Sequence, residues 1–506
     1  PVKSGERELM LGLFSWEILL RRFWDEVLSA VRDVPAPAVP KTLTTIPDKI
    51  PLLAMTDPFT SPTGFGRVGR ELFRRIPQDR FRLGYLGRGW AGSRLIPGIS
   101  TYAASMTDSH CQQTFPVAAM DFSGKEPFLL WTLMDPWQTS WLSYPDTSPL
   151  KTPRSTEFLE GHRHRFRWIG HFPIDGLGPM GGLPLFVKGY IDSMDVPVAM
   201  SEWAAQLIRK ETDKDVRMIS HAVDTAIFYP DPSKEKARKT MDGLYFHGLS
   251  RELSAVMETQ NPDEFIAEVN KRLFHFDGFI VLCVMANRER KYWWDVLRAF
   301  RTLLDDVPDA KLIGVCGHRD ARNPGSYPLE DLCHALGLRL EMDGNNPNVW
   351  LIETVSTEDF LRLLNRLSDV SLLISGGEGR GLPQQEAHAC GRPCIVGDYS
   401  ASTEIAVDSR ELVSPRGFYH MANNVIRRPV YEIRDIADRL KYAARNPSWR
   451  DEVGAKGIEQ AKLLSWERIL PVWIDLFEEA WHDLTLPSQI NEPETSAAQT
   501  EIVATP

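Results

Sequence analysis

Short apolar runs alternate with amphipathic stretches along most of the chain from about residue 50 onward. The run "IPLLAMT" predicts a buried strand, and "RVGRELFRRI", beyond the polar loop "DPFTSPTGFG", predicts a helix. Further strands are predicted at "PFLLWTLM", "RWIGHF" and "VPVAMS". The alternation resumes with "FIVLCVMA", "WWDVLRAFRTLLDDV", "AKLIGVCG", "TEDFLRLLNRL" and "VSLLIS". Strands that alternate with helices predict an α/β fold with parallel sheets covered by helices on both faces.

This alternation occurs in two halves, which meet near residues 225–235. We therefore expect an N-terminal Rossmann-like domain over residues 48–232 and a C-terminal one over residues 233–464. Residues 234–276 are polar and helical in pattern, which indicates an insertion before the second sheet begins. Residues 483–506 are polar and without periodicity, which predicts a disordered tail.

Residues 1–47 predict a separate helical arm followed by a proline-rich linker, "PAPAVPKTLTTIPDKIP". Apolar residues recur in the arm at intervals of three and four: Leu9, Leu13, Trp16, Leu20, Phe23, Val27 and Val31. The opposite face mixes acidic residues with arginines and is not purely basic. This pattern favours packing on protein, either the chain's own body or a second subunit in a homo-oligomer, over a membrane surface.

Composition narrows the class of protein. The 506 residues are too many for one hydrophobic core. The net charge of -10 gives no broad positive field for nucleic acid or an anionic membrane, although the local stretch "HRHRFR" is basic. The six cysteines form no CxxC pair, which indicates reduced thiols in a core. No apolar stretch approaches the roughly 18 residues of a membrane span and there is no secretory signal, so we expect a soluble cytoplasmic protein.

The stretch "SGGEGRGLPQQEAHACGRPCIVGD" (375–398) carries the strongest chemical signal. It follows a predicted strand with a glycine-rich turn and a helix, where Pro383 suits the first helical turn and Gly391 suits the left-handed end. The N-terminus of such a helix favours an anion such as a diphosphate. Glu378 and Glu386 can accept hydrogen bonds from hydroxyl groups on the two sides of that anion. Two carboxylates around a phosphate site suit a sugar joined through a diphosphate to a ribose.

The longer stretch "EGRGLPQQEAHACGRPCIVGDYSASTEIA" resembles the signature of retaining GT-B glycosyltransferases of the glycogen-synthase-like family 4 type (glycosyl transferases group 1). The resemblance implies that Glu386 holds the nucleotide ribose and that Glu378 meets the donor sugar. It also implies that the backbone beside the sugar and phosphates is that of Gly379, Arg380, Gly381 and Leu382. Arg380 stands where the family usually has Phe or Tyr, and it could instead meet a phosphate or an acidic group.

A second resemblance lies in "MANRERKYWWDVLRAFRTLLDDVPDAKLIGVCG". Lys291 and Arg288 align with the family pair that clamps the leaving diphosphate. Two positive charges are what stabilises a departing nucleotide diphosphate. The spacing is shortened and Tyr292 replaces the usual Gly, so Arg290 could take the place of Arg288. We expect Lys291 to face the cleft and to be partly solvated.

The N-terminal half offers weaker candidates. "PTGFGRVGR" matches the family's glycine loop and places Gly64, Phe65, Gly66 and Arg67 at the cleft as donor-binding residues. "WIGHFPIDG" places His171 where the family often has a cleft histidine near the donor sugar, the alternative being an ordinary core or surface histidine. We therefore count His171 with Lys291, Arg288 and Glu378 as a candidate catalytic residue. Asp135, in "TLMDPW", is a further cleft candidate.

No metal or other cofactor is expected. His162 and His164 have an HxH spacing but lack a third ligand, and the resemblance implies a family that works without metal. Further likeness in "SEWAAQLIRKE", "ISHAVDTAIFYP" and the final "SWERILPVWIDLFEEAW" extends the resemblance over residues 48–482. It implies two Rossmann-like domains facing a central cleft, with residues 465–482 as a helix that crosses back to the first domain, and it leaves His221 as structural.

The resemblance implies a retaining, hexosyltransferase-type enzyme that uses a UDP- or GDP-type sugar. It implies same-face attack, with the donor phosphate helping to deprotonate the acceptor hydroxyl. The acceptor stays open between a glycan, a small molecule and a modified base of DNA. A non-catalytic GT-B protein that binds or assembles with partners is the alternative from another class.

Overall fold

The computed structural model describes residues 47–89, 97–143, 152–184, 187–230, 235–245, 264, 274–320, 325–343, 346–353, 357–421 and 425–486. The expected helical arm, most of the expected insertion and most of the expected tail lie outside the described residues. Of the expected insertion, residues 235–245 are helical, and Ala237 and Met241 in this segment are buried in the C-terminal core.

The N-terminal half forms a parallel seven-stranded sheet in the order β3-β2-β1-β4-β5-β6-β7. Its strands are β1 (Ile50–Thr56), β2 (Phe81–Gly87), β3 (Ile99–Ala103), β4 (Phe128–Leu133), β5 (Phe166–Phe172), β6 (Val196–Ala199) and β7 (Arg217–Met218). The helices around it are α3 (Gly64–Phe73), α4 (Phe115–Ser123), α5 (Pro153–His162), α6 (Lys188–Ser193) and α7 (Glu202–Glu211). Apolar side chains fill both faces of the sheet, which explains why its strands are continuous hydrophobic runs.

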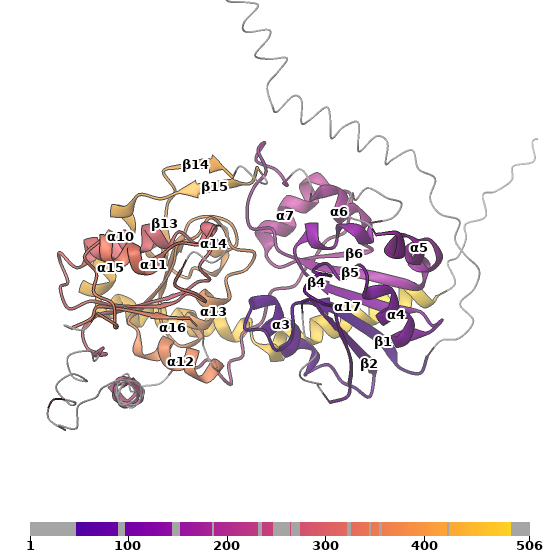
Figure 1. Ribbon diagram of the computed structural model, residues 1–506, viewed down its shortest axis with the longest axis horizontal. Coiled ribbons are helices and arrows are strands. Elements are labelled where there is room, and N and C mark those ends of the chain that lie inside the picture. The colour runs from indigo at the N-terminus through magenta and orange to yellow at the C-terminus, as the bar shows by residue number, and fades with distance from the viewer. Residues whose placement is uncertain are drawn as a thin grey trace, which may run out of the picture.

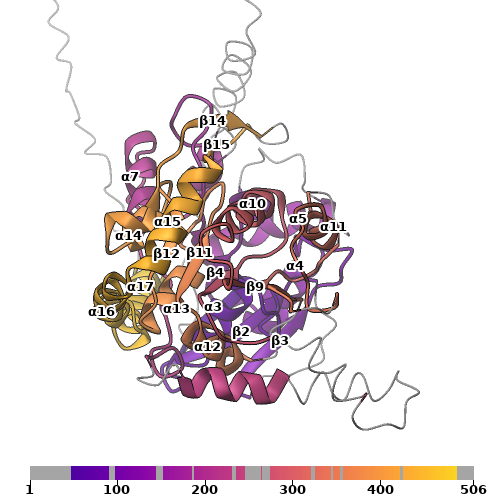
Figure 2. The same ribbon diagram turned by 90° about the vertical axis from the view of Figure 1, so that its left-hand side faces the viewer.

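The C-terminal half forms a parallel six-stranded sheet in the order β10-β9-β8-β11-β12-β13. Its strands are β8 (Ile280–Val284), β9 (Lys311–Val315), β10 (Val349–Ile352), β11 (Val370–Leu373), β12 (Cys394–Gly397) and β13 (Leu412–Val413). Helices α10 (Trp293–Leu303), α11 (Leu329–Ala335) and α15 (Ile433–Arg445) pack on one face, and α12 (Glu358–Leu367), α13 (Leu382–Ala389) and α16 (Pro447–Leu463) pack on the other. Figure 2 shows α10 and α12 on opposite sides of β9.

In each sheet the second and third strands are added on one side of the first strand, and all later strands are added on its other side. This is the doubly wound order, and it confirms the expected α/β fold of two Rossmann-like sheets. Figure 1 shows the two halves side by side. Their strands β2, β3, β7, β10, β12 and β13 were not among those predicted from the sequence.

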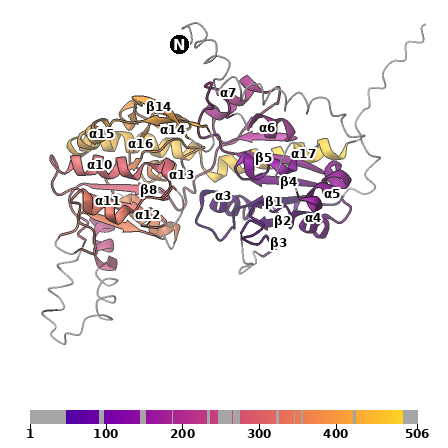
Figure 3. The same ribbon diagram turned by 45° about the horizontal axis from the view of Figure 1, so that its top comes forward.

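The last helix, α17 (Trp466–Thr485), lies against the N-terminal sheet although it follows the C-terminal domain in sequence. Trp473 packs edge-on against Trp131 of β4, and Phe477 packs edge-on against Phe81 of β2. Figure 3 shows α17 running from the C-terminal domain along the N-terminal one.

A two-stranded antiparallel hairpin, β14 (Gly417–His420) and β15 (Arg427–Val430), was not predicted. It belongs to the C-terminal half but reaches the N-terminal domain, because the Arg427 N–H donates to the carbonyl oxygen of Leu177 at 2.7 Å. The hairpin therefore ties the two domains together beside their junction (Figure 1).

Candidate active site

The carboxyl ends of the N-terminal strands face the C-terminal domain. Arg67, in the helix that follows β1, reaches Glu386, and Asp175, in the segment after β5, reaches Arg428. The carboxyl ends of parallel strands share one edge of a sheet, and in open α/β sheets this edge is where ligands bind. We therefore expect the ligand-binding site at the junction of the two domains.

Helix α13 lies at this junction, and its two ends are set by the proline and glycines predicted to mark them. Gly381 has φ 91° at the residue before the helix, Pro383 stands in its first turn, and Gly391 has φ 72° just beyond its end. The preceding loop lies against the other domain. Gly377 has φ 140°, and a Cβ atom there would lie 1.7 Å from the Asp175 carbonyl oxygen. Only glycine fits both its conformation and its surroundings.

Lys291 and Glu378 form a buried ion pair at the centre of the junction. Their side chains are only 10% and 8% exposed, and the Lys291 ammonium donates to Oε1 of Glu378. The expectation that Lys291 is partly solvated is therefore wrong. Its partner lies 87 residues away in the sequence, so the burial of this charge cannot be read from its own segment.

The electrostatics of this pair follow from its burial. Desolvation lowers the pKa of the Lys291 ammonium to about 8, although Glu378 favours the charged form. Desolvation by itself would raise the pKa of Glu378, but the charges of Lys291 and Arg290 hold that pKa below its usual value. The carboxylate is thus ionised at neutral pH, and the ammonium holds its proton less tightly than an exposed lysine does.

Arg290, and not Arg288, is the arginine beside this pair. Its guanidinium lies 3.7 Å from Glu378, 3.7 Å from Asp175 and 2.8 Å from the Gly377 carbonyl oxygen. Arg288 is exposed. The reason is local backbone geometry: Glu289–Lys291 form a 3-10 turn, and Tyr292 has φ 32°.

Glu386 is held by an arginine of the other domain. Its Oε1 accepts from Nη2 of Arg67 at 2.5 Å, and Arg67 also bonds Glu358 of α12 at 3.1 Å. Glu386 is 1% exposed, and its Oε2 has no hydrogen-bond partner within the described residues. Burial raises the pKa of Glu386, while the charge of Arg67 opposes that shift. The second oxygen is therefore a buried acceptor that is available to a ligand.

Arg380 also meets an acidic group, one supplied by the protein. Its guanidinium lies 3.3 Å from Glu404, whose carboxylate accepts the backbone N–H groups of Glu202 and Trp203 at the start of α7. Burial lowers the pKa of Arg380 to about 10. Arg380 and Glu404 thus link the loop before α13 to the N-terminal domain.

The glycine-rich residues occupy varied positions. Gly64 lies beside Leu382 of the opposite domain, and Phe65 packs in the same apolar layer as Leu382. Gly66 faces its own loop, because a Cβ atom there would lie 2.4 Å from the Pro58 carbonyl oxygen. Gly379 lies against Pro173 of the N-terminal domain.

His171 lies in a buried aromatic cluster. It is completely buried, and its ring contacts are Trp131, Trp473 and His221. Burial and the neighbouring His221 hold the pKa of His171 well below its usual value, so the ring is neutral. The structure thus places His171 in the core layer beneath α17, and these contacts do not include the Lys291–Glu378 pair.

The structure adds residues that the sequence reading missed. Asp175 accepts from Arg428 at 3.1 Å, and Arg428 also donates to the Gly376 carbonyl oxygen at 3.0 Å. Asp175 lies in the segment "WIGHFPIDG", three residues after the end of β5, and this position after a strand is a signal that could have identified it. Arg428 lies in the unpredicted hairpin, and no sequence signal marks it.

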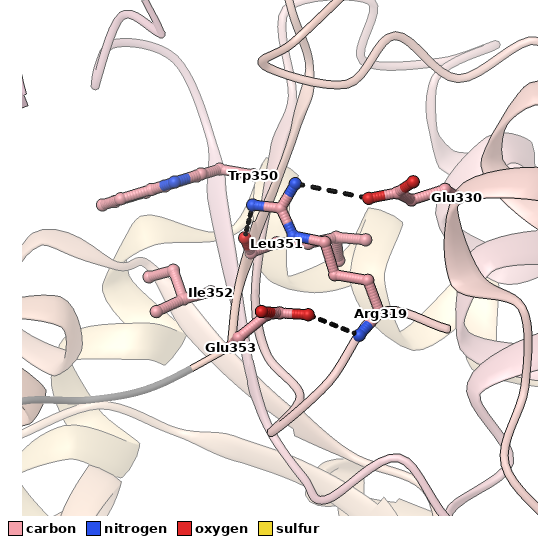
Figure 4. Close-up of a pocket in the computed structure, with 6 residues that line it drawn as sticks. All are labelled: Arg319, Glu330, Trp350, Leu351, Ile352 and Glu353. Carbon is pink, nitrogen blue, oxygen red and sulfur yellow. Dashed lines mark hydrogen bonds and ion pairs between the residues drawn. The ribbon is translucent and has the colours of Figure 1, made fainter. Parts of the chain in front are cut away.

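The domains are closed on each other at this junction. A pocket of about 20 Å³ is lined there by residues that include Arg67, Glu358, Leu382 and Glu386. A larger hollow of about 440 Å³ lies at the edge of the C-terminal sheet, away from these residues. Figure 4 shows Arg319 within that hollow, bonded to Glu330 and to the Leu351 carbonyl oxygen. Of the candidate residues, Arg67, Leu382 and Glu386 line the small pocket, whereas the described lining of the large hollow includes none of them.

Within the described ranges, no group of three or more His, Cys, Asp or Glu side chains is arranged to hold a metal ion. In the same part of the chain, no helix is long and apolar enough to cross a membrane.

Comparisons with known proteins agree with this architecture. Residues 266–459 match the family model described as glycosyl transferases group 1. Among solved structures, sucrose-phosphate synthase from Thermosynechococcus elongatus superposes with a TM-score of 0.63 at 15% identity, over 86% of this chain and 100% of that one. Anabaena HepE in complex with UDP and glucose gives a TM-score of 0.55 at 13% identity, over 85% of this chain and 100% of that one. The fold is therefore the GT-B fold.

Curated relatives match only part of this chain. A D-inositol 3-phosphate glycosyltransferase from Nocardioides sp. is 28% identical over 37% of this chain and 38% of its own length. O-antigen chain mannosyltransferase B from Escherichia coli is 24% identical over 25% of this chain and 32% of its own length. The chain thus spans well under half the length of these relatives. The resemblance to group 1 glycosyl transferases is confirmed for residues 266–459.

Proposed function

We propose that this chain is a retaining glycosyltransferase that moves a sugar from a nucleotide-diphosphate sugar to an acceptor hydroxyl. The observation that carries the proposal is the cluster of Lys291, Arg290 and Glu378 just before the N-terminus of α13, with Glu386 in the second turn of that helix. Two cations and a helix N-terminus match a diphosphate, and two carboxylates match the hydroxyl groups at its two ends. The family match over residues 266–459 and the UDP and glucose held by Anabaena HepE support the same donor class.

The donor would enter by separating the domains. A pocket of about 20 Å³ is far below the several hundred Å³ that ligands of this size occupy. Separation breaks the Arg67–Glu386 pair, and a ribose hydroxyl then replaces the guanidinium on the Glu386 carboxylate. Because this broken contact is exchanged for one with the donor, opening and binding are coupled.

The reaction then places negative charge on the departing diphosphate. Lys291 and Arg290 attract that charge more strongly as the bond to the anomeric carbon lengthens, which lowers the barrier. The acceptor oxygen bonds to the anomeric carbon on the face that the diphosphate leaves, and the acceptor proton passes to a diphosphate oxygen. Retention of configuration rests on the resemblance to the retaining family.

The test is turnover by the purified chain. A panel of UDP- and GDP-sugars is incubated with a mixture of glycan and small-molecule acceptors, and free nucleotide is measured. We expect one donor to release nucleotide well above its spontaneous rate, with the α-anomeric donor giving an α-linked product by NMR. A β-linked product would reject retention, and neither binding nor turnover of any nucleotide sugar would reject the function.

A further inference from the structure

The N-terminal side of the junction carries a second set of polar residues, which the donor chemistry does not use. They follow the carboxyl ends of neighbouring strands: Asp57 after β1, Arg88 after β2, and Asp135 and Trp137 after β4. This edge of the sheet faces the C-terminal domain, as the contacts of Arg67 and Asp175 show. The set therefore lies on the acceptor side of the proposed donor.

Most of the charges in this set are already paired. Arg88 holds Asp57 through two nitrogens, at 3.0 and 2.5 Å from the same carboxylate oxygen. Asp175 is held by Arg428 at 3.1 Å and lies 3.7 Å from Arg290. Arg88 and Arg428 could therefore bind a further anion only by releasing these carboxylates.

Asp135 is different, because the described residues include no cation within ion-pair distance of its carboxylate. Burial raises the pKa of Asp135 to about 6, and the nearby charge of Asp175 adds to that shift. The charges of Arg290 and Arg88 oppose that shift. A carboxylate in this state is a strong acceptor for a hydroxyl group, and at neutral pH it repels an anion.

Trp137 provides an apolar surface two residues further on. It lies in the 3-10 turn Pro136–Gln138 and is 45% exposed, which is unusual for so large an aromatic side chain. The ring of His110 stands edge-on to it at 5.5 Å, and the His110 carbonyl oxygen accepts from Trp141 at 2.9 Å. Burial lowers the pKa of His110, so this neighbour is neutral at pH 7.

We propose that the acceptor is a neutral sugar or polyol, held by stacking on Trp137 and by a hydroxyl hydrogen bond to Asp135. This inference rests on the proposed function, since it assigns the acceptor side of the same junction. An aromatic face binds the C–H face of a sugar ring, while a carboxylate binds its hydroxyl groups. A phosphorylated acceptor would instead meet Asp57, Asp135 and Asp175 on one side and the donor diphosphate on the other.

The experiment uses the full chain with the nucleotide sugar that it turns over. Maltose, methyl α-D-glucoside and myo-inositol are compared with glucose 6-phosphate and myo-inositol 1-phosphate as acceptors. We expect the neutral compounds to raise the rate of nucleotide release about tenfold or more over the rate without acceptor, and the phosphorylated compounds to give less. Stimulation that is greater with the phosphorylated compounds would overturn the inference.

Two variants test the named residues. Asp135→Asn keeps the shape of the side chain, and Trp137→Ala removes the ring. Each is expected to raise the acceptor KM about tenfold, the scale of one lost charged or aromatic contact, with the Kd for UDP or GDP unchanged. Asp215→Asn, at a carboxylate 88% exposed on the same domain, is the control and should leave the acceptor KM unchanged. An unchanged acceptor KM in both variants would overturn the inference. If the wild-type chain bound neither UDP nor GDP, that result would instead reject the proposed function.

Discussion

Replacing Lys291 by methionine should destabilise the protein, and the buried pair with Glu378 sets the size of the effect. The substitution leaves the Glu378 carboxylate, 8% exposed, without its ammonium partner. Breaking a buried pair by removing one member typically costs about 3–5 kcal/mol. Arg290 stays 3.7 Å from the carboxylate and compensates in part, so we expect about 3 kcal/mol.

The double variant Lys291→Met/Glu378→Gln separates this reason from a simple packing defect. With both charges removed, no buried carboxylate is left uncompensated, and such replacements are often close to neutral. The double variant should therefore recover most of the stability that the single one loses. Lys456→Met is the control, because Lys456 pairs with Glu452 on an exposed helix surface, and it should change stability by less than about 0.5 kcal/mol.

Urea unfolding, followed by circular dichroism, gives these differences, and the thermal midpoint provides a second measure. For a domain of this size about 3 kcal/mol corresponds to a fall of roughly 6–12 °C in Tm. A single variant as stable as the wild type would refute the reasoning, and so would a double variant no more stable than the single one.

Three further outcomes follow from the junction. Glu386→Gln should weaken nucleotide-sugar binding by about 1.5–3 kcal/mol in calorimetry, whereas Glu358→Gln, which shares the same arginine partner, should weaken it less than threefold; equal effects would remove Glu386 from the ribose site. Since the ammonium form of Lys291 is needed and its pKa is about 8, kcat/KM should fall as pH rises through about 8, and Lys291→Arg should remove that fall; an unchanged alkaline limb would contradict the assignment. Gly377→Ala should lower Tm and turnover together, because the added Cβ atom would force the loop before α13 away from the Asp175 carbonyl oxygen. Gly161→Ala, where no atom lies within 4 Å of the added Cβ, should lower neither. If Gly377→Ala kept the Tm and turnover of the wild type, the domains would not close as described.

Local signals were enough to predict the main elements of the fold. Hydrophobic runs such as β1, β4 and β8 are buried on both faces, so their sequences are apolar throughout and easy to recognise. Helix α13 was equally clear, since Pro383 and Gly391 mark its two ends through backbone preferences alone. The strand β2 was missed because "FRLGYLG" mixes two glycines and an arginine into a buried strand.

The pairing within the site could not be predicted in the same way. Lys291 and Glu378, and likewise Arg67 and Glu386, are brought together across 87 and 319 residues, and only the packing of the domains decides which charges meet. The shortened spacing and Tyr292 raised Arg290 as an alternative to Arg288, but only the backbone geometry, with Tyr292 at φ 32°, shows which arginine lies beside the pair. Residue type therefore indicated the chemistry, while the tertiary structure determined the partners.

The most direct test of the central claim is calorimetric titration of UDP, GDP and their sugars into the wild type and into Lys291→Met/Glu378→Gln. The claim is that this buried pair lies where the donor binds. We predict that the wild type binds one nucleotide sugar and that the double variant, folded as shown by its Tm, binds it at least about a hundredfold more weakly, as expected from two lost charged contacts. Equal affinity in a folded double variant would place the donor elsewhere and contradict the account.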